Sequence, residues 1–95
     1  MTYRETLRKA IRLGIRVSDL VIANECDCIF EFEYTNEQFE QLCEKAHECY
    51  LKAESVDENA LEQAINDLIM VDDWTIQEVL NLDKWELIDK AIRYM

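Results

Sequence analysis

Residues 35–53 read TNEQFEQLCEKAHECYLKA, and this stretch decides the fold class. Thr35 is followed three residues later by Gln38, which is the spacing of a capping box at the start of a helix. Apolar side chains then recur every three or four residues, at Phe39, Leu42, Cys43, Ala46, Tyr50 and Ala53. This period predicts an amphipathic helix over residues 36–53, with its apolar face buried.

The same start signal occurs four more times along the chain: at Thr2 with Glu5, Ser55 with Glu58, Thr75 with Glu78 and Asp83 with Glu86. Ser18 offers one further helix start. The first helix is expected to end at Gly14, the only glycine, because glycine adopts the left-handed conformation at low cost.

The apolar spacing also predicts which side chains of the later helices are buried. The helix after Ser55 is expected to turn inward Leu61, Ala64, Ile65, Leu68 and Ile69. In the last helix, Trp85, Ile88 and Ile92 are expected to be buried, and Trp74 is expected to be at least partly buried beside them.

These signals predict an all-α fold, a compact bundle of five or six short helices that forms one acidic helical domain over residues 1–95. The chain is 49% hydrophobic and has one glycine and no proline, so it has material for a core but few turn residues. Residues 24–34 are less clear, because Cys28, Phe30, Phe32 and Tyr34 alternate with other side chains. A short extended segment near residues 28–34 and a continued helix both fit that pattern.

No stretch of the sequence approaches the roughly 18 consecutive apolar residues of a membrane span. The basic residues near the N-terminus recur through a helical pattern and do not precede an apolar core, so a signal peptide is not expected. We therefore expect a cytoplasmic protein with reduced cysteines and no membrane partner. A single glycine also excludes a glycine-rich phosphate loop.

Cysteine and histidine are the side chains that could hold a metal or attack a substrate: Cys26, Cys28, Cys43, His47 and Cys49. Only one residue separates Cys26 from Cys28, which is closer than structural zinc sites normally allow. Cys43 belongs to the apolar stripe, where a thiol acts as a small hydrophobe. We expect no metal and no cofactor. The single histidine has no catalytic signature around it, and we expect no enzymatic activity.

Charge is the most unusual feature of the sequence. The chain carries 10 basic and 21 acidic residues, for a net charge of −11. Residues 1–16 hold five basic residues and one acid (+4), and residues 17–95 hold five basic residues and twenty acids (−15). Direct nucleic-acid binding is not expected, because phosphates repel such an excess of carboxylates. One simple interpretation is that the basic first helix docks on an acidic face of the same chain.

The predicted central helix carries a row of glutamates three or four residues apart, at Glu37, Glu40, Glu44 and Glu48. Residues four apart on a helix rise by about 6 Å, close to two phosphate steps of about 3.4 Å along DNA. In size and charge the chain resembles small acidic phage proteins that inhibit restriction or CRISPR nucleases. The four glutamates are therefore candidate contacts for a basic surface of a nucleic-acid-binding protein, and the chain is interpreted as a non-enzymatic inhibitor or regulator.

A competing interpretation is a small helical adaptor that binds its partner through an apolar patch. Phe30, Phe32 and Tyr34 would supply that patch. The two interpretations differ in salt dependence, because only a charged contact weakens steeply when ions screen it.

Overall fold

The computed structural model describes residues 3–22 and 35–95. Within these residues the chain forms six α-helices and no strand, so the all-α prediction is confirmed. The helices are α1 (Tyr3–Leu13), α2 (Val17–Ile22), α3 (Asn36–Lys52), α4 (Glu58–Asn66), α5 (Ile76–Asn81) and α6 (Lys84–Ile92), and a π-helical segment, η1 (Asp67–Val71), continues α4. The segment expected near residues 28–34 lies outside the described residues, as does the expected cap at Thr2.

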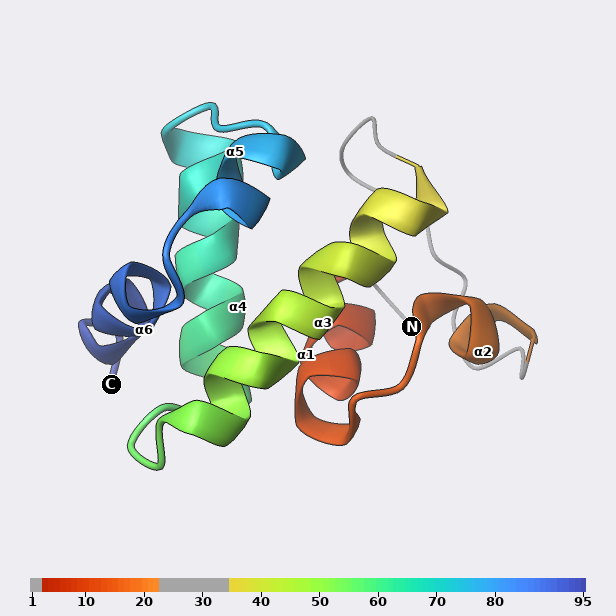
Figure 1. Ribbon diagram of the computed structural model, residues 1–95, viewed down its shortest axis with the longest axis horizontal. Coiled ribbons are helices and arrows are strands. Elements are labelled where there is room, and N and C mark those ends of the chain that lie inside the picture. The colour runs from red at the N-terminus through yellow and green to blue at the C-terminus, as the bar shows by residue number, and fades with distance from the viewer. Residues whose placement is uncertain (1–2, 23–34) are drawn as a thin grey trace.

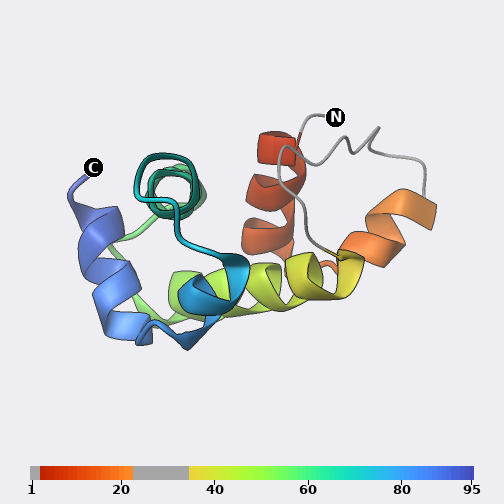
Figure 2. The same cartoon turned by 90° about the horizontal axis from the view of Figure 1, so that it is seen from above.

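Helix α3 is the longest helix and organises the packing, since α1, α2, α5 and α6 all contact it. Helices α1 and α4 also contact each other, and α6 packs against α4 (Figure 1). Figure 2 shows α3 running along one side of the molecule, with α1 and α4 both on the same side of it. The largest fully buried side chains include Tyr3 of α1 and Phe39 of α3, whose ring centroids lie 5.3 Å apart.

The sequence pattern of α3 is confirmed in detail. Phe39, Leu42, Cys43 and Ala46 are buried, and the helix ends at Lys52, one residue earlier than predicted. Thr35 Oγ1 accepts a hydrogen bond from the Gln38 backbone N–H at 3.1 Å, and Gln38 Oε1 accepts one from the Thr35 N–H at 3.0 Å. This reciprocal pair satisfies two donors that the first turn of a helix leaves free.

Two of the predicted helix starts are wrong. Ser55 lies in the turn before α4, and Asp57 caps the helix instead, because its carboxylate accepts the Ala60 N–H at 2.8 Å. Ser18 lies inside α2, which begins at Val17. Thr75 forms the predicted capping box with Glu78. Asp83 caps α6 as predicted, with its carboxylate accepting the Trp85 N–H at 2.9 Å.

The predicted buried stripe of α4 and η1 is confirmed, but that of α6 is centred wrongly. Trp85 and Ile92 are 51% and 43% exposed, whereas Leu87, Ile88 and Ala91 are buried. The apolar residues of α6 spread around much of the helix, so spacing alone did not show which of them meets α4. Trp74 is half-buried, as expected.

Gly14 ends α1 as predicted, with φ at +67° and its N–H bonded to the Ala10 carbonyl at 2.7 Å. A Cβ atom at this position would lie 2.7 Å from Nε2 of His47 on α3. The site therefore needs glycine for its backbone conformation and also for the close approach of the two helices.

Replacing Gly14 with alanine is expected to lower the free energy of unfolding by at least about 1–2 kcal/mol, the cost of a left-handed L-residue. The overlap with His47 adds to this loss. Urea denaturation followed by circular dichroism measures the change. In a His47→Ala background the overlap disappears and Gly14→Ala should cost less. Equal stability of Gly14→Ala and the parent protein would contradict this account.

Candidate protein-binding surface

The four glutamates of the predicted binding stripe lie along one face of α3, since they are three or four residues apart. Glu37, Glu44 and Glu48 are exposed, and Glu40 is half-buried. We call these four residues the acidic stripe. Their surroundings differ, so the stripe is not a uniform row of free charges.

Glu40 is committed to the fold. Its carboxylate accepts a hydrogen bond from the Ser18 N–H at 3.1 Å, at the start of α2. A carboxylate at a helix N-terminus satisfies a free donor and opposes the helix dipole. Glu40 therefore attaches the six-residue α2 to α3. It also satisfies the Ser18 N–H, a donor that the first turn of a helix leaves free.

Glu48 is shared with a cation of the same chain. It forms an ion pair with Lys84, the first residue of α6. The hydrogen bond from Lys84 lowers the pKa of Glu48 and raises the pKa of Lys84. Among residues 3–22 and 35–95, neither Glu37 nor Glu44 forms an ion pair or side-chain hydrogen bond. These two carboxylates are the free part of the acidic stripe.

Lys45, on the border of the acidic stripe, connects α3 to the end of α5. Its Nζ donates to the carbonyls of Val79 at 2.9 Å and Leu80 at 2.7 Å, and also to that of Leu82. A cation there satisfies carbonyls that the last turn of a helix leaves free. Partial burial lowers the pKa of Lys45. Sequence reasoning missed this residue, and its only signal was a lysine between an apolar and an acidic face.

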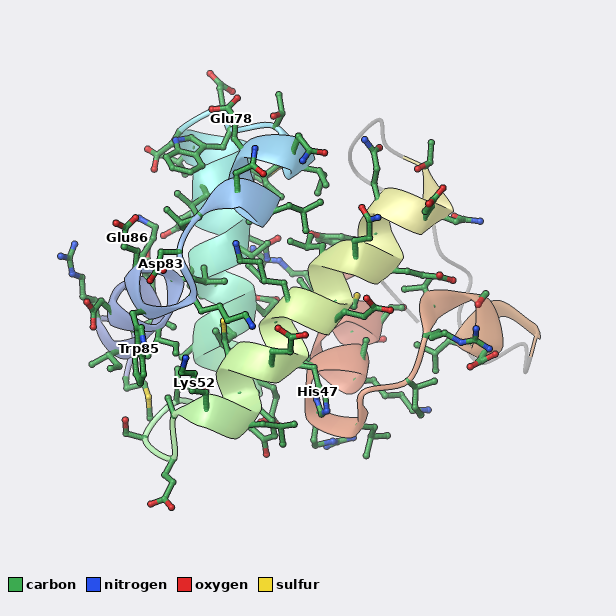
Figure 3. The ribbon with its side chains drawn as sticks, viewed as in Figure 1. His47, Lys52, Glu78, Asp83, Trp85 and Glu86 are labelled. Carbon is green, nitrogen blue, oxygen red and sulfur yellow. The ribbon has the colours of Figure 1, made fainter. Side chains whose placement is uncertain are left out.

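A groove of about 450 Å³ lies beside the acidic stripe, between α3 and the connection from α5 to α6. Trp85, half exposed, lines it together with Gln41, Glu44, Lys45, Glu48, Lys52, Leu80, Leu82, Asp83 and Lys84. Lys52 Nζ lies 4.7 Å from the centroid of the Trp85 ring, a cation–π contact. Figure 3 shows Lys52 reaching from the end of α3 toward Trp85 on α6.

The basic face of α1 does dock internally, but on α4 and not on the acidic stripe. Arg4 and Arg8 place their Nε atoms 3.5 and 3.8 Å from Glu62, whose side chain is only 5% exposed. Arg8 also donates to Asn59 at 3.1 Å. This arrangement neutralises a buried carboxylate that would be costly alone.

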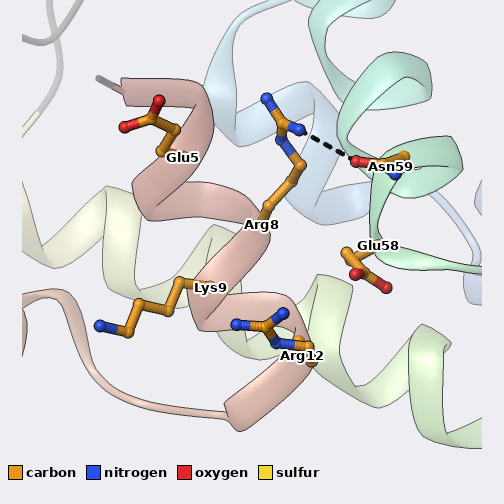
Figure 4. A pocket seen from close by; sticks show the side chains of 6 residues that line it. All are labelled: Glu5, Arg8, Lys9, Arg12, Glu58 and Asn59. Carbon is orange, nitrogen blue, oxygen red and sulfur yellow. Dashed lines mark hydrogen bonds between the residues drawn. The ribbon is translucent and has the colours of Figure 1, made fainter. Parts of the chain in front are cut away.

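A cleft of about 410 Å³ opens between α1 and the start of α4 (Figure 4). It is lined by Glu5, Arg8, Lys9, Arg12, Glu58 and Asn59. Carboxylates and cations therefore share its wall, and Arg8 is already bonded to Asn59. The basic residues of α1 do not form a surface of one sign in this cleft.

The cysteines and the histidine among the described residues have packing roles. Cys43 and Cys49 are buried, and burial raises the pKa of Cys49, which disfavours the nucleophilic thiolate. His47 Nδ1 hydrogen-bonds to the Ile11 carbonyl near the end of α1. Among the described residues, no three His, Cys, Asp or Glu side chains are grouped to hold a metal ion. Cys26 and Cys28 lie outside the described residues.

Comparison with known proteins gives no relative: no family model matches the chain, and no curated protein or solved structure matches it at the significance required. Within the described part of the chain, none of the helices is both long and apolar enough to cross a membrane. The aromatic residues of the competing adaptor interpretation, Phe30, Phe32 and Tyr34, lie outside the described residues. The acidic stripe is thus the candidate site whose surroundings are known.

The hydrogen bond from Ser18 predicts that two neighbouring glutamates of the stripe differ in their effect on stability. Glu40→Ala is expected to lower the free energy of unfolding by about 1 kcal/mol, as for the loss of a helix cap. Glu44→Ala, its matched control, should change stability by less than about 0.5 kcal/mol, as for an exposed side chain. Urea denaturation measures both. Equal effects would show that the Glu40 contact contributes nothing.

The absence of a zinc site stays a prediction, which metal removal tests. We expect elemental analysis of the purified protein to show much less than one zinc per chain. Chelation with EDTA should leave the midpoint of thermal unfolding unchanged, because a structural zinc contributes directly to folding. One zinc per chain and unfolding on chelation would instead place Cys26, Cys28, Cys43 and His47 in a metal site.

Proposed function

We propose that this protein is a non-enzymatic inhibitor or regulator that binds a basic surface of a nucleic-acid-binding protein, in the place of nucleic acid. Bacterial defence nucleases of the restriction and CRISPR type are the class of partner that fits this role best. The observation that carries the proposal is the acidic stripe on α3, where Glu37 and Glu44 are exposed and neither carboxylate forms an ion pair with a cation of the described residues.

The spacing of these two free carboxylates supports phosphate mimicry. Seven residues of helix separate them, a rise of about 10.5 Å at about 1.5 Å per residue. Three phosphate steps of about 3.4 Å each span nearly the same length of a DNA strand. Lysines and arginines placed to grip a phosphate backbone can therefore reach both carboxylates.

The chemistry of the described residues favours binding over catalysis. Burial disfavours the thiolate form of Cys49, and the single histidine, His47, is hydrogen-bonded to the Ile11 carbonyl near the end of α1. Net charge supports the same role, because a chain at −11 is steered toward basic surfaces over long distances.

The test is a pull-down from bacterial lysate with three immobilised proteins: the parent chain, Glu37→Lys/Glu44→Lys, and Glu54→Lys/Asp89→Lys. The two variants change net charge equally, but Glu54 and Asp89 are exposed acids outside the stripe. We expect the parent and the control to retain the same nucleic-acid-binding protein, and the stripe variant to lose it. Mass spectrometry identifies the captured protein.

Salt and DNA competition then test the mechanism with that purified partner. Binding should weaken steeply between 0.1 M and 1 M salt, because the screening length falls from about 10 Å to about 3 Å. Duplex DNA should compete for the same site. Binding that persists at 1 M salt, ignores DNA or tolerates Glu37→Lys/Glu44→Lys would show that the stripe is only a solvated helix face.

A further inference from the structure

We propose that the groove between α3 and the start of α6 receives an arginine side chain of the partner, stacked on the indole of Trp85. This inference rests on the proposed function, because it supplies the second contact of the same basic partner. We call the site the Trp85 groove: Leu80 and Leu82 come from α5 and its end, Glu44 and Glu48 from α3, and Trp85 from α6.

The first support is the exposure of the indole. Trp85 is 51% exposed although it lies on a helix with three buried residues, and it borders a groove of about 450 Å³. Tryptophan is the residue most enriched where truncation costs the most binding energy in protein interfaces, together with tyrosine and arginine.

The second support is a cation already placed on this ring. Lys52 Nζ lies 4.7 Å from the ring centroid, so this face of the indole already holds a positive charge. Lys84 likewise forms an ion pair with Glu48 at the edge of the same groove. Each is an exposed lysine of the same chain, and each holds a position that a partner's cation can take.

Arginine suits these positions better than lysine. Its guanidinium is planar, stacks on an aromatic ring and can donate two parallel hydrogen bonds to a carboxylate. It also loses less hydration than an ammonium when it leaves water. Glu48 lines the same groove and stands one helical turn before Lys52 on α3. A guanidinium that takes the places of Lys52 and Lys84 can thus meet the Glu48 carboxylate and the indole in the Trp85 groove.

Lys52 competes with the partner's arginine, and this predicts a gain of affinity on its removal. Lys52→Met should tighten binding of an arginine-rich probe by about two- to fivefold, which corresponds to an exposed cation–π contact. Lys90→Met is the control for charge: it removes the same charge at a position on α6 outside the groove, where Lys90 Nζ lies 4.0 Å from a carboxylate oxygen of Asp72. Its smaller gain measures the contribution of net charge alone.

The experiment uses octa-arginine and octa-lysine peptides with a full-length protein in which Trp74→Phe leaves Trp85 as the single tryptophan. We expect octa-arginine to change the Trp85 emission and to bind several times more tightly than octa-lysine. Trp85→Leu should remove this preference for arginine, measured by calorimetry. Circular dichroism checks that the Trp85→Leu variant is folded. Lys52→Met tests the same groove by changing an exposed residue outside the hydrophobic core.

The outcomes separate this inference from the proposed function. If both peptides bind equally and Lys52→Met behaves like Lys90→Met, the arginine site is overturned, while capture of a partner through Glu37 and Glu44 still stands. If octa-arginine binds through Trp85 but no nucleic-acid-binding protein is captured by the stripe, the proposed function fails and the arginine site remains. Unchanged Trp85 emission at saturating octa-arginine also overturns the site.

Discussion

The hydrogen bonds from Lys45 to the end of α5 hold together the two parts of the surface on which a partner would be recognised. One ammonium group satisfies the carbonyls of Val79, Leu80 and Leu82, and so fixes the connection from α5 to α6 against α3. Lys84 and Trp85 follow directly in the chain, and their place beside the acidic stripe depends on that connection. Without Lys45 the carbonyls of Leu80 and Leu82, which form part of the groove, would lose this donor.

Acidic residues outnumber basic residues in this chain, and the structure shows which groups the basic side chains contact. Arg4 and Arg8 neutralise the buried Glu62, Lys45 caps α5, and Lys84 pairs with Glu48. Each of these contacts joins two helices, so these four cations stabilise packing. Glu37 and Glu44 are left over after this pairing. Like charges three or four residues apart along the acidic stripe disfavour the helix slightly, and they persist on α3 because its buried face supplies the stability.

The sequence predicted the features that depend on local spacing. The capping box of Thr35, the buried stripe of α3 and the stop at Gly14 each follow from residues within a few positions of one another. It did not predict contacts between distant residues, such as Glu40 with Ser18 or Lys45 with Leu80. The exposure of Trp85 was missed for the same reason, since it depends on how α6 meets α4. The spacing therefore predicted the acidic stripe, but only the structure showed which of its glutamates contact other helices.

The two parts of the surface would respond differently to salt, and in the proposed complex this difference would allow selection between basic partners. Glu37 and Glu44 attract any basic protein at long range, with a strength that salt screens. The Trp85 groove acts only at contact, and stacking on an indole is less sensitive to salt. Lys52 and Lys84 have to be displaced there, so a partner gains from the groove only when its own cation fits better. Charge would then set the rate of encounter, and the groove would decide which basic partner stays bound.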